Sequence, residues 1–219
     1  MTRSILSSTD CPDPSRSLSP VERFVKRVMD VIIAISCLII SLPVLGIVAV
    51  IIRIDSLGPV LIRQERVGKN GKSFQLLKFR SMFVGADKDI RKVLGVNPIK
   101  SSSLKIQDDP RVTHAGRVLR RWSIDEFPQF WNVLCGDMSI VGPRPEETWI
   151  VELYNDQQLQ RLTVKPGLTG PMQISGRGEL DMDARLVLEL NYINNFSIWN
   201  DIKILIKTIP VVISGKGAY

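Results

Sequence analysis

The sequence predicts an α/β protein with a small antiparallel sheet, several amphipathic helices and a long apolar segment near its start. Three observations carry this prediction: a 25-residue apolar run over residues 28–52, two β-like stretches on either side of an Asn-Gly turn, and helical apolar periodicity further along the chain. At 219 residues, the chain has room for one ordinary domain with an appendage. We therefore expect a tail over residues 1–20, a membrane segment over 21–55 and a folded domain over 56–219.

Composition narrows the classes of partner. The net charge of +7 means that the surface attracts anions such as nucleic acid, acidic lipid headgroups or phosphorylated small molecules. We do not expect nucleic acid, because the Lys and Arg residues are not interleaved with aromatic residues and no helix-turn-helix or RNA-binding signature is present. The three cysteines are far apart in the sequence, so neither a disulfide framework nor a zinc site is indicated.

The chain contains a single histidine, His114. A mechanism that needs a Ser-His or His-His pair is therefore excluded, and the acid, base and nucleophile must come from carboxylates, lysines or hydroxyls. His114 itself lies in a basic stretch, and we interpret it as a surface residue rather than a ligand.

Residues 1–20 are rich in Ser and Pro and show no apolar periodicity, so we interpret them as a disordered tail. They do not resemble a signal peptide, because the apolar run starts too late and no small-residue cleavage site follows it.

The apolar run over residues 28–52 contains one charged residue, Asp30, near its start. As a helix at about 1.5 Å per residue it reaches roughly 37 Å, enough to cross a hydrocarbon core of about 30 Å. Pro43, however, removes a backbone hydrogen bond in the middle of the run and forces a kink. The flanks are almost equally basic, with four Lys or Arg residues over 8–27 and five over 53–72, so the positive-inside rule gives little orientation. A spanning helix and a hairpin that enters and leaves by one face are both compatible with these residues.

The folded domain begins after the turn at Gly58-Pro59. Apolar spacing and turn residues then predict its elements in order. We expect a short strand at 60–62, a hairpin turn at 69–72, a strand at 74–79, a short helix and a loop within 85–110, helices over 114–121 and 127–135, a rigid loop at 142–145, a helix over 146–160, a second rigid loop at 165–171, a long helix over 181–195 and an amphipathic helix over 199–209.

The densest candidate site is the segment 120–128, where Asp125 and Glu126 lie beside paired arginines and a proline. One carboxylate could attack phosphorus or hold a metal ion, while the arginines neutralise phosphate oxygens. A purely structural interpretation is also open, because Ser123 and Glu126 have the spacing of a helix capping box. Pro128 weakens it, since a helix that starts near Pro128 would leave both carboxylates just ahead of its first turn.

Two rigid loops hold further candidates. Prolines on both sides of Arg144 restrict its backbone, which lowers the entropy lost when the side chain binds an anion. Lys165 precedes a Pro-Gly pair in a similar setting. The alternative for each loop is an ordinary turn with a solvated charge.

Together these segments resemble the bacterial sugar transferases, which are monotopic polyprenyl-phosphate phosphoglycosyl transferases. The resemblance runs from about Phe24 to the C-terminus, and it rests on eight blocks that occur in the same order. The blocks are Lys26-Arg27-x-x-Asp30, residues 63–68 (RQERVG), 78–82 (KFRSM), 109–113 (DPRVT), 123–129 (SIDEFPQ), 132–139 (NVLCGDMS), 141–145 (VGPRP) and 165–170 (KPGLTG).

The resemblance implies an Asp-Glu dyad, which falls on Asp125 and Glu126. Asp125 is then expected to attack the sugar-bearing phosphate of a UDP-sugar, release UMP and hold a covalent phospho-sugar, which undecaprenyl or another polyprenyl phosphate accepts. Glu126 is expected to bind Mg²⁺. The residues expected to bind substrate phosphate are Arg120, Arg144, Arg80, Lys78 and Lys165.

The resemblance also favours the hairpin, a re-entrant helix-break-helix element with its break at Ser41 and Pro43. Residues 56–219 then form a cytoplasmic catalytic domain with interfacial helices at the bacterial inner membrane, and the reaction begins exopolysaccharide, O-antigen or glycoconjugate synthesis. The sequence does not specify the sugar, the acceptor's chain length or the oligomeric state, and a homodimer is compatible with it.

The chain departs from its relatives at two places. Leu42 separates Ser41 from Pro43, which puts in doubt a hydroxyl bond that braces the kink, and residues 171–173 (PMQ) replace the usual residues after the second rigid loop, so sugar specificity is not carried over. Two other functions stay open: a membrane-anchored basic adaptor without catalysis, and a metal-dependent phosphohydrolase that uses the same carboxylates with water as acceptor.

Overall fold

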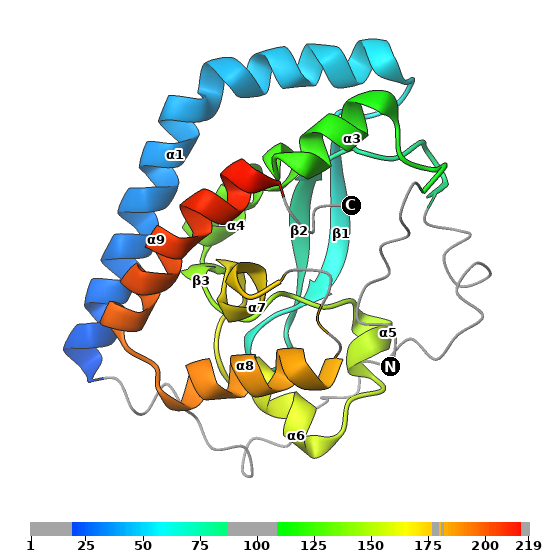
Figure 1. Cartoon of the computed structure of the whole chain (residues 1–219). Helices are drawn as coiled ribbons and strands as arrows, with labels where there is room; N and C mark the ends of the chain where they lie inside the picture. Colours follow the sequence, from blue (N-terminus) through cyan, green and yellow to red (C-terminus); the bar gives the residue numbers. More distant parts are fainter. Residues whose placement is uncertain (1–18, 87–108, 177–179, 181, 216–219) are drawn as a thin grey trace.

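The computed structural model describes residues 19–86, 109–176, 180 and 182–215. A long helix runs up one side of the molecule, a two-stranded ribbon crosses its middle, and shorter helices surround the ribbon (Figure 1). The helices are α1 (Pro20–Asp55), α3 (His114–Arg121), α4 (Gln129–Cys135), α5 (Thr148–Val151), α6 (Asp156–Leu159), α7 (Pro171–Ile174), α8 (Met182–Asn194) and α9 (Ile198–Ser214). The strands are β1 (Leu61–Val67), β2 (Ser73–Phe79), β3 (Ser139–Val141) and β4 (Gly167–Thr169), and three short 3₁₀ helices are η2 (Lys69–Gly71), η4 (Ile124–Glu126) and η5 (Gln160–Thr163).

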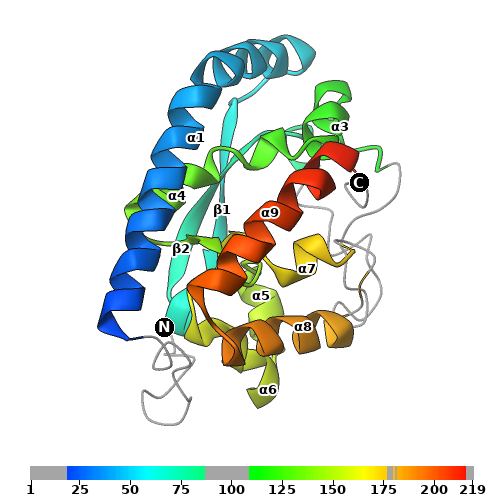
Figure 2. The same ribbon diagram turned by 60° about the vertical axis from the view of Figure 1, so that its left-hand side comes forward.

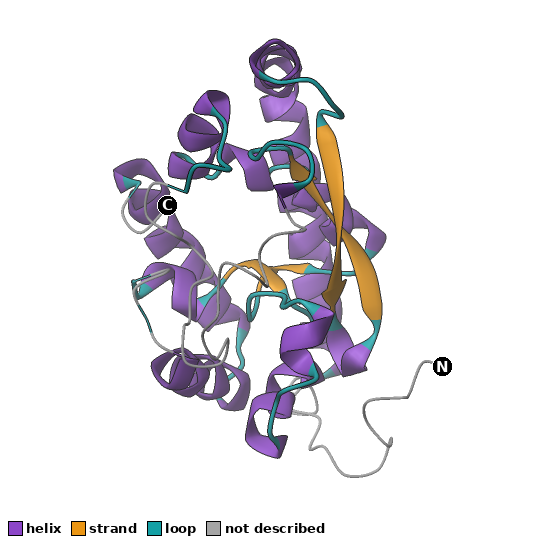
Figure 3. Ribbon diagram, turned by 90° about the vertical axis from the view of Figure 1, so that its right-hand side faces the viewer, coloured by secondary structure: helices purple, strands orange, loops and turns teal. Residues whose placement is uncertain are grey.

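The predicted antiparallel hairpin is confirmed, although its first strand, expected at 60–62, extends over Leu61–Val67. β1 pairs with β2 in a register that runs from Leu61 opposite Phe79 to Val67 opposite Ser73, and the Asn-Gly turn holds Asn70 at φ 56°. A second, unpredicted pair lies near the centre of the molecule, where β3 and β4 run parallel (Figure 3). The α/β class with a small antiparallel sheet is therefore correct, and the parallel pair is an addition to it.

Helix α1 begins in a capping box, in which the Ser19 hydroxyl and the Glu22 carboxylate each accept a backbone N–H, and Pro20 occupies the first turn. Pro43 lies inside the helix, which changes direction partway along its length (Figure 1). The Ser41 hydroxyl donates to the Leu38 carbonyl at 3.3 Å, so a hydroxyl-to-backbone bond exists beside the break although Leu42 separates the two residues. By length and composition α1 could cross a membrane, and only 17% of its most apolar stretch is buried.

The N-terminal half of α1 is attached to the domain by three of its charged residues, Lys26, Arg27 and Asp30. Ala34 continues this contact into the main core, which also includes Leu76, Val133 and Ile204. Lys26 Nζ donates to Asp201 Oδ2 (2.5 Å) and to the Val141 carbonyl (3.3 Å). The Arg27 guanidinium donates to the carbonyls of Val133 (2.6 Å) and Leu134 (2.8 Å). The Asp30 carboxylate accepts from the Ser139 hydroxyl (2.8 Å) and the Ile140 amide (3.0 Å).

The C-terminal half of α1 packs on a separate cluster. Val48 and Ile52 of α1 are buried there against Phe79 of β2 and Leu119 of α3. The guanidinium of Arg80 closes the end of the helix, because it donates to the carbonyls of Ile52 (3.2 Å), Ser56 (2.5 Å) and Leu57 (3.0 Å). Both halves of α1 therefore bind the same folded domain (Figure 2).

Several predicted helices were correct, and one was wrong. The 114–121 helix has the predicted bounds, and those at 127–135, 181–195 and 199–209 correspond to α4, α8 and α9, the last extending through Pro210. The single helix expected over 146–160 is instead α5 and α6. The cause is local, because the Asn155 side chain caps a new helix by accepting from the Gln158 amide. Two predicted segments lie outside the described residues. They are the tail up to residue 18 and, for residues 87–108, the helix and loop expected within 85–110.

Candidate active site

The two adjacent carboxylates lie in a tight turn between two helices. After α3 ends at Arg121, Ser123 adopts a left-handed conformation with φ 55°, and the 3₁₀ helix η4 then carries Asp125 and Glu126. The Ser123 side chain makes no capping bond, so the capping box that its spacing allowed is not formed. The next helix starts directly after Pro128, which leaves both carboxylates ahead of its first turn.

Asp125 is buried, with 2% of its surface exposed, and Lys78 supplies its counter-charge. The Lys78 ammonium lies 2.8 Å from Asp125 Oδ2 and comes from the second-last residue of β2. Burial of a carboxylate is costly unless a counter-charge or hydrogen bonds compensate it. The arrangement keeps an anionic oxygen in place beside a cation that can also attract phosphate.

Glu126 makes a two-pronged pair with Arg144. Arg144 Nη2 lies 2.7 Å from Glu126 Oε1, and Nη1 lies 3.4 Å from Oε2. The Glu126 carboxylate raises the pKa of the Arg144 guanidinium, against burial, which lowers it. Because the fork of an arginine matches a carboxylate or a phosphate equally well, Arg144 can exchange one for the other without changing its own orientation.

Arg120 belongs to the same charged group. Its Nε donates to the Ser81 hydroxyl at 3.0 Å. Burial lowers the pKa of its guanidinium, and the carboxylates of Asp125 and Asp109 oppose that shift. Asp109 in turn holds Arg111 in a bidentate pair, with the closest N to O distance at 2.7 Å. The dyad therefore has three cations around it, Lys78, Arg120 and Arg144.

The loop that carries Arg144 is locked against the second rigid loop. β3 and β4 lead into these loops side by side, and a Cβ on Gly142 would lie 2.5 Å from the Lys165 carbonyl oxygen. A Cβ on Gly170 would lie 2.1 Å from the Gly142 carbonyl oxygen. Glycine is needed at both positions because the two backbones touch, and the contact fixes where the chain enters the Pro143-Arg144-Pro145 turn.

The structure does not bring all predicted site residues to the dyad. Arg80 is 3% exposed, and its guanidinium binds the end of α1 as described above. Lys165 lies beside Gly136 and Arg27, and burial lowers the pKa of its ammonium, with the Arg27 charge as the second cause. His114 starts α3 and is exposed, as predicted.

Other polar and charged residues near the dyad were not predicted. They are Ser81, Asp109 and Arg111 in front of Arg120, and Glu146, Arg161, Arg185 and Glu189 behind Arg144. Two of these, Arg185 and Glu189, have the spacing of a helical ion pair, which was a readable signal, but such pairs usually lie on an exposed face.

Two carboxylates suit a metal ion that binds together with the substrate better than one that the protein holds by itself. Within the described ranges no group of three or more His, Cys, Asp or Glu residues could hold a metal ion. Mg²⁺ commonly uses only one or two carboxylates and takes its remaining ligands from substrate phosphates and water. Asp125 and Glu126 can supply that number.

Comparison with known proteins gives consistent matches. A family model described as bacterial sugar transferase matches residues 21–215. The chain is 47% identical over 198 residues to the galactosyl transferase CpsE of Streptococcus agalactiae, covering 88% of this chain and 43% of that protein. It is 42% identical over 210 residues to the UDP-glucose:undecaprenyl-phosphate glucose-1-phosphate transferase of Escherichia coli, covering 92% and 43%.

A shorter relative matches along its whole length. The exopolysaccharide production protein ExoY of Sinorhizobium fredii is 38% identical over 222 residues, which cover all of this chain and 98% of that protein. The chain thus spans less than half the length of CpsE and of the Escherichia coli protein, but almost all of ExoY.

Proposed function

The chain belongs to the bacterial sugar transferase family, and on this premise we propose that it transfers a hexose 1-phosphate from a UDP-sugar to undecaprenyl phosphate. The products are UMP and undecaprenyl-diphosphate-sugar. The observation that carries the proposal is the buried Asp125 carboxylate, adjacent to Glu126 and surrounded by Lys78, Arg120 and Arg144. Names of relatives supply the substrate class, since one is an undecaprenyl-phosphate galactose phosphotransferase and another acts with UDP-glucose.

We assign the nucleophile to Asp125. Its carboxylate oxygen attacks the sugar-bearing phosphorus of the UDP-sugar, the bond from that phosphorus to the bridging oxygen breaks, and UMP leaves with the bond electrons. An acyl phosphate then joins the enzyme to the sugar. An oxygen of undecaprenyl phosphate attacks the same phosphorus, and the Asp125 carboxylate leaves.

Both attacking groups are already anions, so no base has to remove a proton from either of them. This agrees with a site whose chain has one histidine, exposed at the start of α3. Charge is the main obstacle, because an anion must approach an anionic diphosphate. Lys78, Arg120 and Arg144 are placed to lower that barrier by holding phosphate oxygens.

Mg²⁺ is proposed as the cofactor, with Glu126 as its protein ligand. When bound, the ion would neutralise the diphosphate and help UMP to leave. Glu126 would then bind the ion in place of Arg144, and the Arg144 guanidinium, in the same orientation, would bind the substrate phosphate.

We also propose that α1 is a re-entrant membrane element with both ends on the cytoplasmic side of the bacterial inner membrane. Both halves of α1 are bonded to one domain, and the break at Pro43 lies between them. The outward side chains around the break are apolar, with exposures of 77% for Ile40 and 68% for Leu42. A straight spanning helix would carry Lys26, Arg27 and Asp30 across the bilayer, away from their partners. We propose that the reaction is the first membrane step of exopolysaccharide or related glycoconjugate synthesis, in line with the exopolysaccharide production protein among its relatives.

The test is a single-turnover experiment on the full chain in lipid nanodiscs. With Mg²⁺ and a panel of UDP-sugars but no lipid acceptor, we expect about one UMP per active site and an intact-mass gain equal to one hexose phosphate. Asp125→Asn should give neither, while remaining folded and membrane-bound. Absence of both the burst and the adduct with every UDP-sugar, or a normal burst from Asp125→Asn, would refute the assignment. Continuous UMP release without lipid acceptor would identify a hydrolase.

A further inference from the structure

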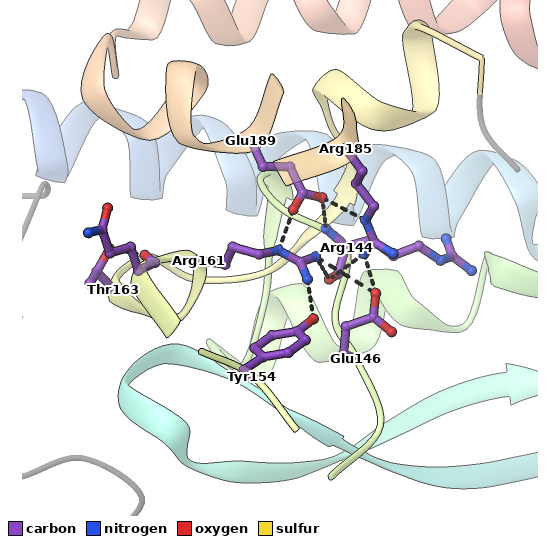
Figure 4. A network of polar contacts seen from close by, with 8 residues as sticks. Arg144, Glu146, Tyr154, Arg161, Thr163, Arg185 and Glu189 are labelled. Atoms are coloured by element: carbon purple, nitrogen blue, oxygen red, sulfur yellow. Dashed lines mark hydrogen bonds and ion pairs between the residues drawn. The ribbon is translucent and has the colours of Figure 1, made fainter. Parts of the chain in front are cut away.

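A buried group of charged side chains surrounds Arg144 (Figure 4), whose guanidinium pairs with Glu126. Arg161 comes from η5, Arg185 and Glu189 come from α8, and their side chains are 3%, 5% and 0% exposed. Glu189 forms ion pairs with both arginines, at 3.2 Å to Arg185 Nε. Glu146 forms a second bridge to Arg185. None of these four residues has a role in the chemistry proposed above.

The group converges on the main chain of Arg144. The Arg144 amide N–H donates to Glu189 Oε1 at 3.4 Å. The Arg144 carbonyl accepts from Arg161 Nη2 at 3.3 Å and from Arg185 Nη2 at 3.4 Å. Each of these bonds is long and weak by itself, but together they engage both main-chain polar groups of one residue. The Arg144 guanidinium is left to face Glu126.

The chain on either side of Arg144 is also fixed. Pro143 and Pro145 hold their own φ angles and carry no amide hydrogen. Before them Gly142 packs against the second rigid loop, and after them the Val67 amide of β1 donates to the Glu146 carbonyl at 2.9 Å. The φ angles of both prolines are therefore fixed, and the buried charges act on the polar groups of the residue between them, the Arg144 amide and carbonyl.

Stability does not explain why charges occupy this position. Burying an ion costs several kcal/mol, and well-packed apolar residues are often as stable or more stable in its place. Holding a charged side chain to within about half an ångström of a productive position, by contrast, needs partners with fixed geometry, and an arginine fork supplies it.

We infer that Arg161, Arg185 and Glu189 are positioning residues, which hold the main chain of Arg144 so that its guanidinium points at Glu126 and at the substrate phosphate. The inference rests on the proposed function for the substrate, but the hold on Arg144 can be measured without turnover. It deepens the assignment of the site by adding three residues that act through Arg144 and do not touch substrate.

The decisive variant is Glu189→Asp in the full chain in nanodiscs. It keeps the buried charge and moves the carboxylate one methylene back from the Arg144 amide and from Arg161. Hydrogen exchange is read on a peptide that covers residues 142–147. Pro143 and Pro145 have no amide hydrogen, so the Arg144 amide is one of few exchangeable amides in this peptide. We expect the Arg144 amide to exchange at least about tenfold faster in the variant than in the wild type.

The second readout is the rate of the first UMP release. A displacement of about 1 Å can cost on the order of a hundredfold in rate, so we expect Glu189→Asp to be about 10- to 100-fold slower than the wild type. In an Arg144→Ala background the same change should have little further effect, because the residue through which it acts is absent. Leu186→Ala is the matched control: it removes a buried side chain of the same helix, and it should lower the melting temperature while leaving exchange at Arg144 and the rate near wild type.

Unchanged exchange at Arg144 in Glu189→Asp overturns the inference, as does an equal loss of rate with and without Arg144. If Glu189→Asp does not fold, Arg185→Lys, which keeps the charge and loses the fork, replaces it with the same two readouts. A third outcome separates the two proposals. If Glu189→Asp exchanges faster at Arg144 but the wild type releases UMP from no UDP-sugar, the inference about Arg144 holds and the proposed function is refuted.

Discussion

The topology of α1 gives the sharpest physical test, through the substitution Pro43→Ala. Proline inside a helix lacks an amide hydrogen and clashes with the preceding turn, which costs about 3 kcal/mol. Alanine removes that cost and favours a straight helix by about the same amount. A straight helix could span the membrane, but only if the N-terminal half leaves the domain to which it is bonded.

The bonds that would be lost outweigh the gain. Lys26, Arg27 and Asp30 make six hydrogen bonds to the domain, all of them involving a charged group. Such bonds contribute about 1.5–3 kcal/mol each, so even the lower figure gives about 9 kcal/mol. The net preference for the re-entrant form is then about 6 kcal/mol or more, which is over four powers of ten in population. We therefore expect Pro43→Ala alone to keep both ends of α1 on one side.

The assay is thiol labelling in intact cells. Single cysteines at Ser8 and at Lys72, in a chain that lacks Cys11, Cys37 and Cys135, should both resist a membrane-impermeant reagent, in the parent and in Pro43→Ala. Replacing Lys26 and Arg27 by Met and Asp30 by Asn, in addition to Pro43→Ala, should expose the Ser8 position, because the anchors are gone and the flank has also lost basic charge. Strong labelling at Ser8 with Pro43→Ala alone, while Lys72 stays protected, would refute the reasoning.

Three further changes probe the site and its support. Glu126→Gln should raise the Mg²⁺ concentration for half-maximal UMP release about tenfold or more, and an unchanged titration would remove Glu126 as the metal ligand. Arg80→Met should lower the melting temperature but leave the KM for UDP-sugar unchanged, because its guanidinium binds the end of α1; a raised KM would restore it to phosphate binding. Hydrogen bonds from Arg111 hold the pKa of Asp109 below its usual value, so the stability that this carboxylate contributes is present above about pH 4 and is lost as the pH falls further. Asp109→Asn should therefore flatten the acid side of the melting-temperature profile.

Local signals predicted the parts of the fold that depend on neighbouring residues. The β1–β2 ribbon follows from an Asn-Gly turn between two β-like stretches, and α3 begins where Thr113 caps it. The parallel β3–β4 pair could not be predicted in this way. Its strands have three residues each, and their pairing depends on the close approach of Gly142 and Gly167, which lie far apart in the sequence.

The helix expected over residues 146–160 failed for a related reason. Its apolar residues have helical spacing, but Asn155 caps a new helix from within the segment. The residues after it pack near Arg144, since Arg161 donates a hydrogen bond to the Arg144 carbonyl. A network that joins η5 and α8 to one loop has no signature in the spacing of any single segment.

The local structure around Asp125 and Glu126 was partly predictable from one proline. Ser123 and Glu126 match a capping box by spacing alone, and the structure places Ser123 instead in a left-handed turn. Pro128 weakened the capping interpretation, because a helix that tolerates a proline must start close to it, and the carboxylates then lie outside the helix, as they do in the structure. Which cations lie at the dyad was harder to predict, because the sequence does not show whether an Arg or Lys side chain binds substrate or backbone.

Lys78 and Arg80 show how far this ambiguity reaches. They lie two residues apart in one block, and in a continuing strand they would share a face. β2 ends at Phe79, however, so Lys78 reaches Asp125 while Arg80 turns to the last carbonyls of α1. One short segment therefore contacts both the proposed nucleophile, through Lys78, and the C-terminal end of α1, through Arg80. Two cations from one sequence block thus have different partners, and the end of β2 between them decides which partner each one reaches.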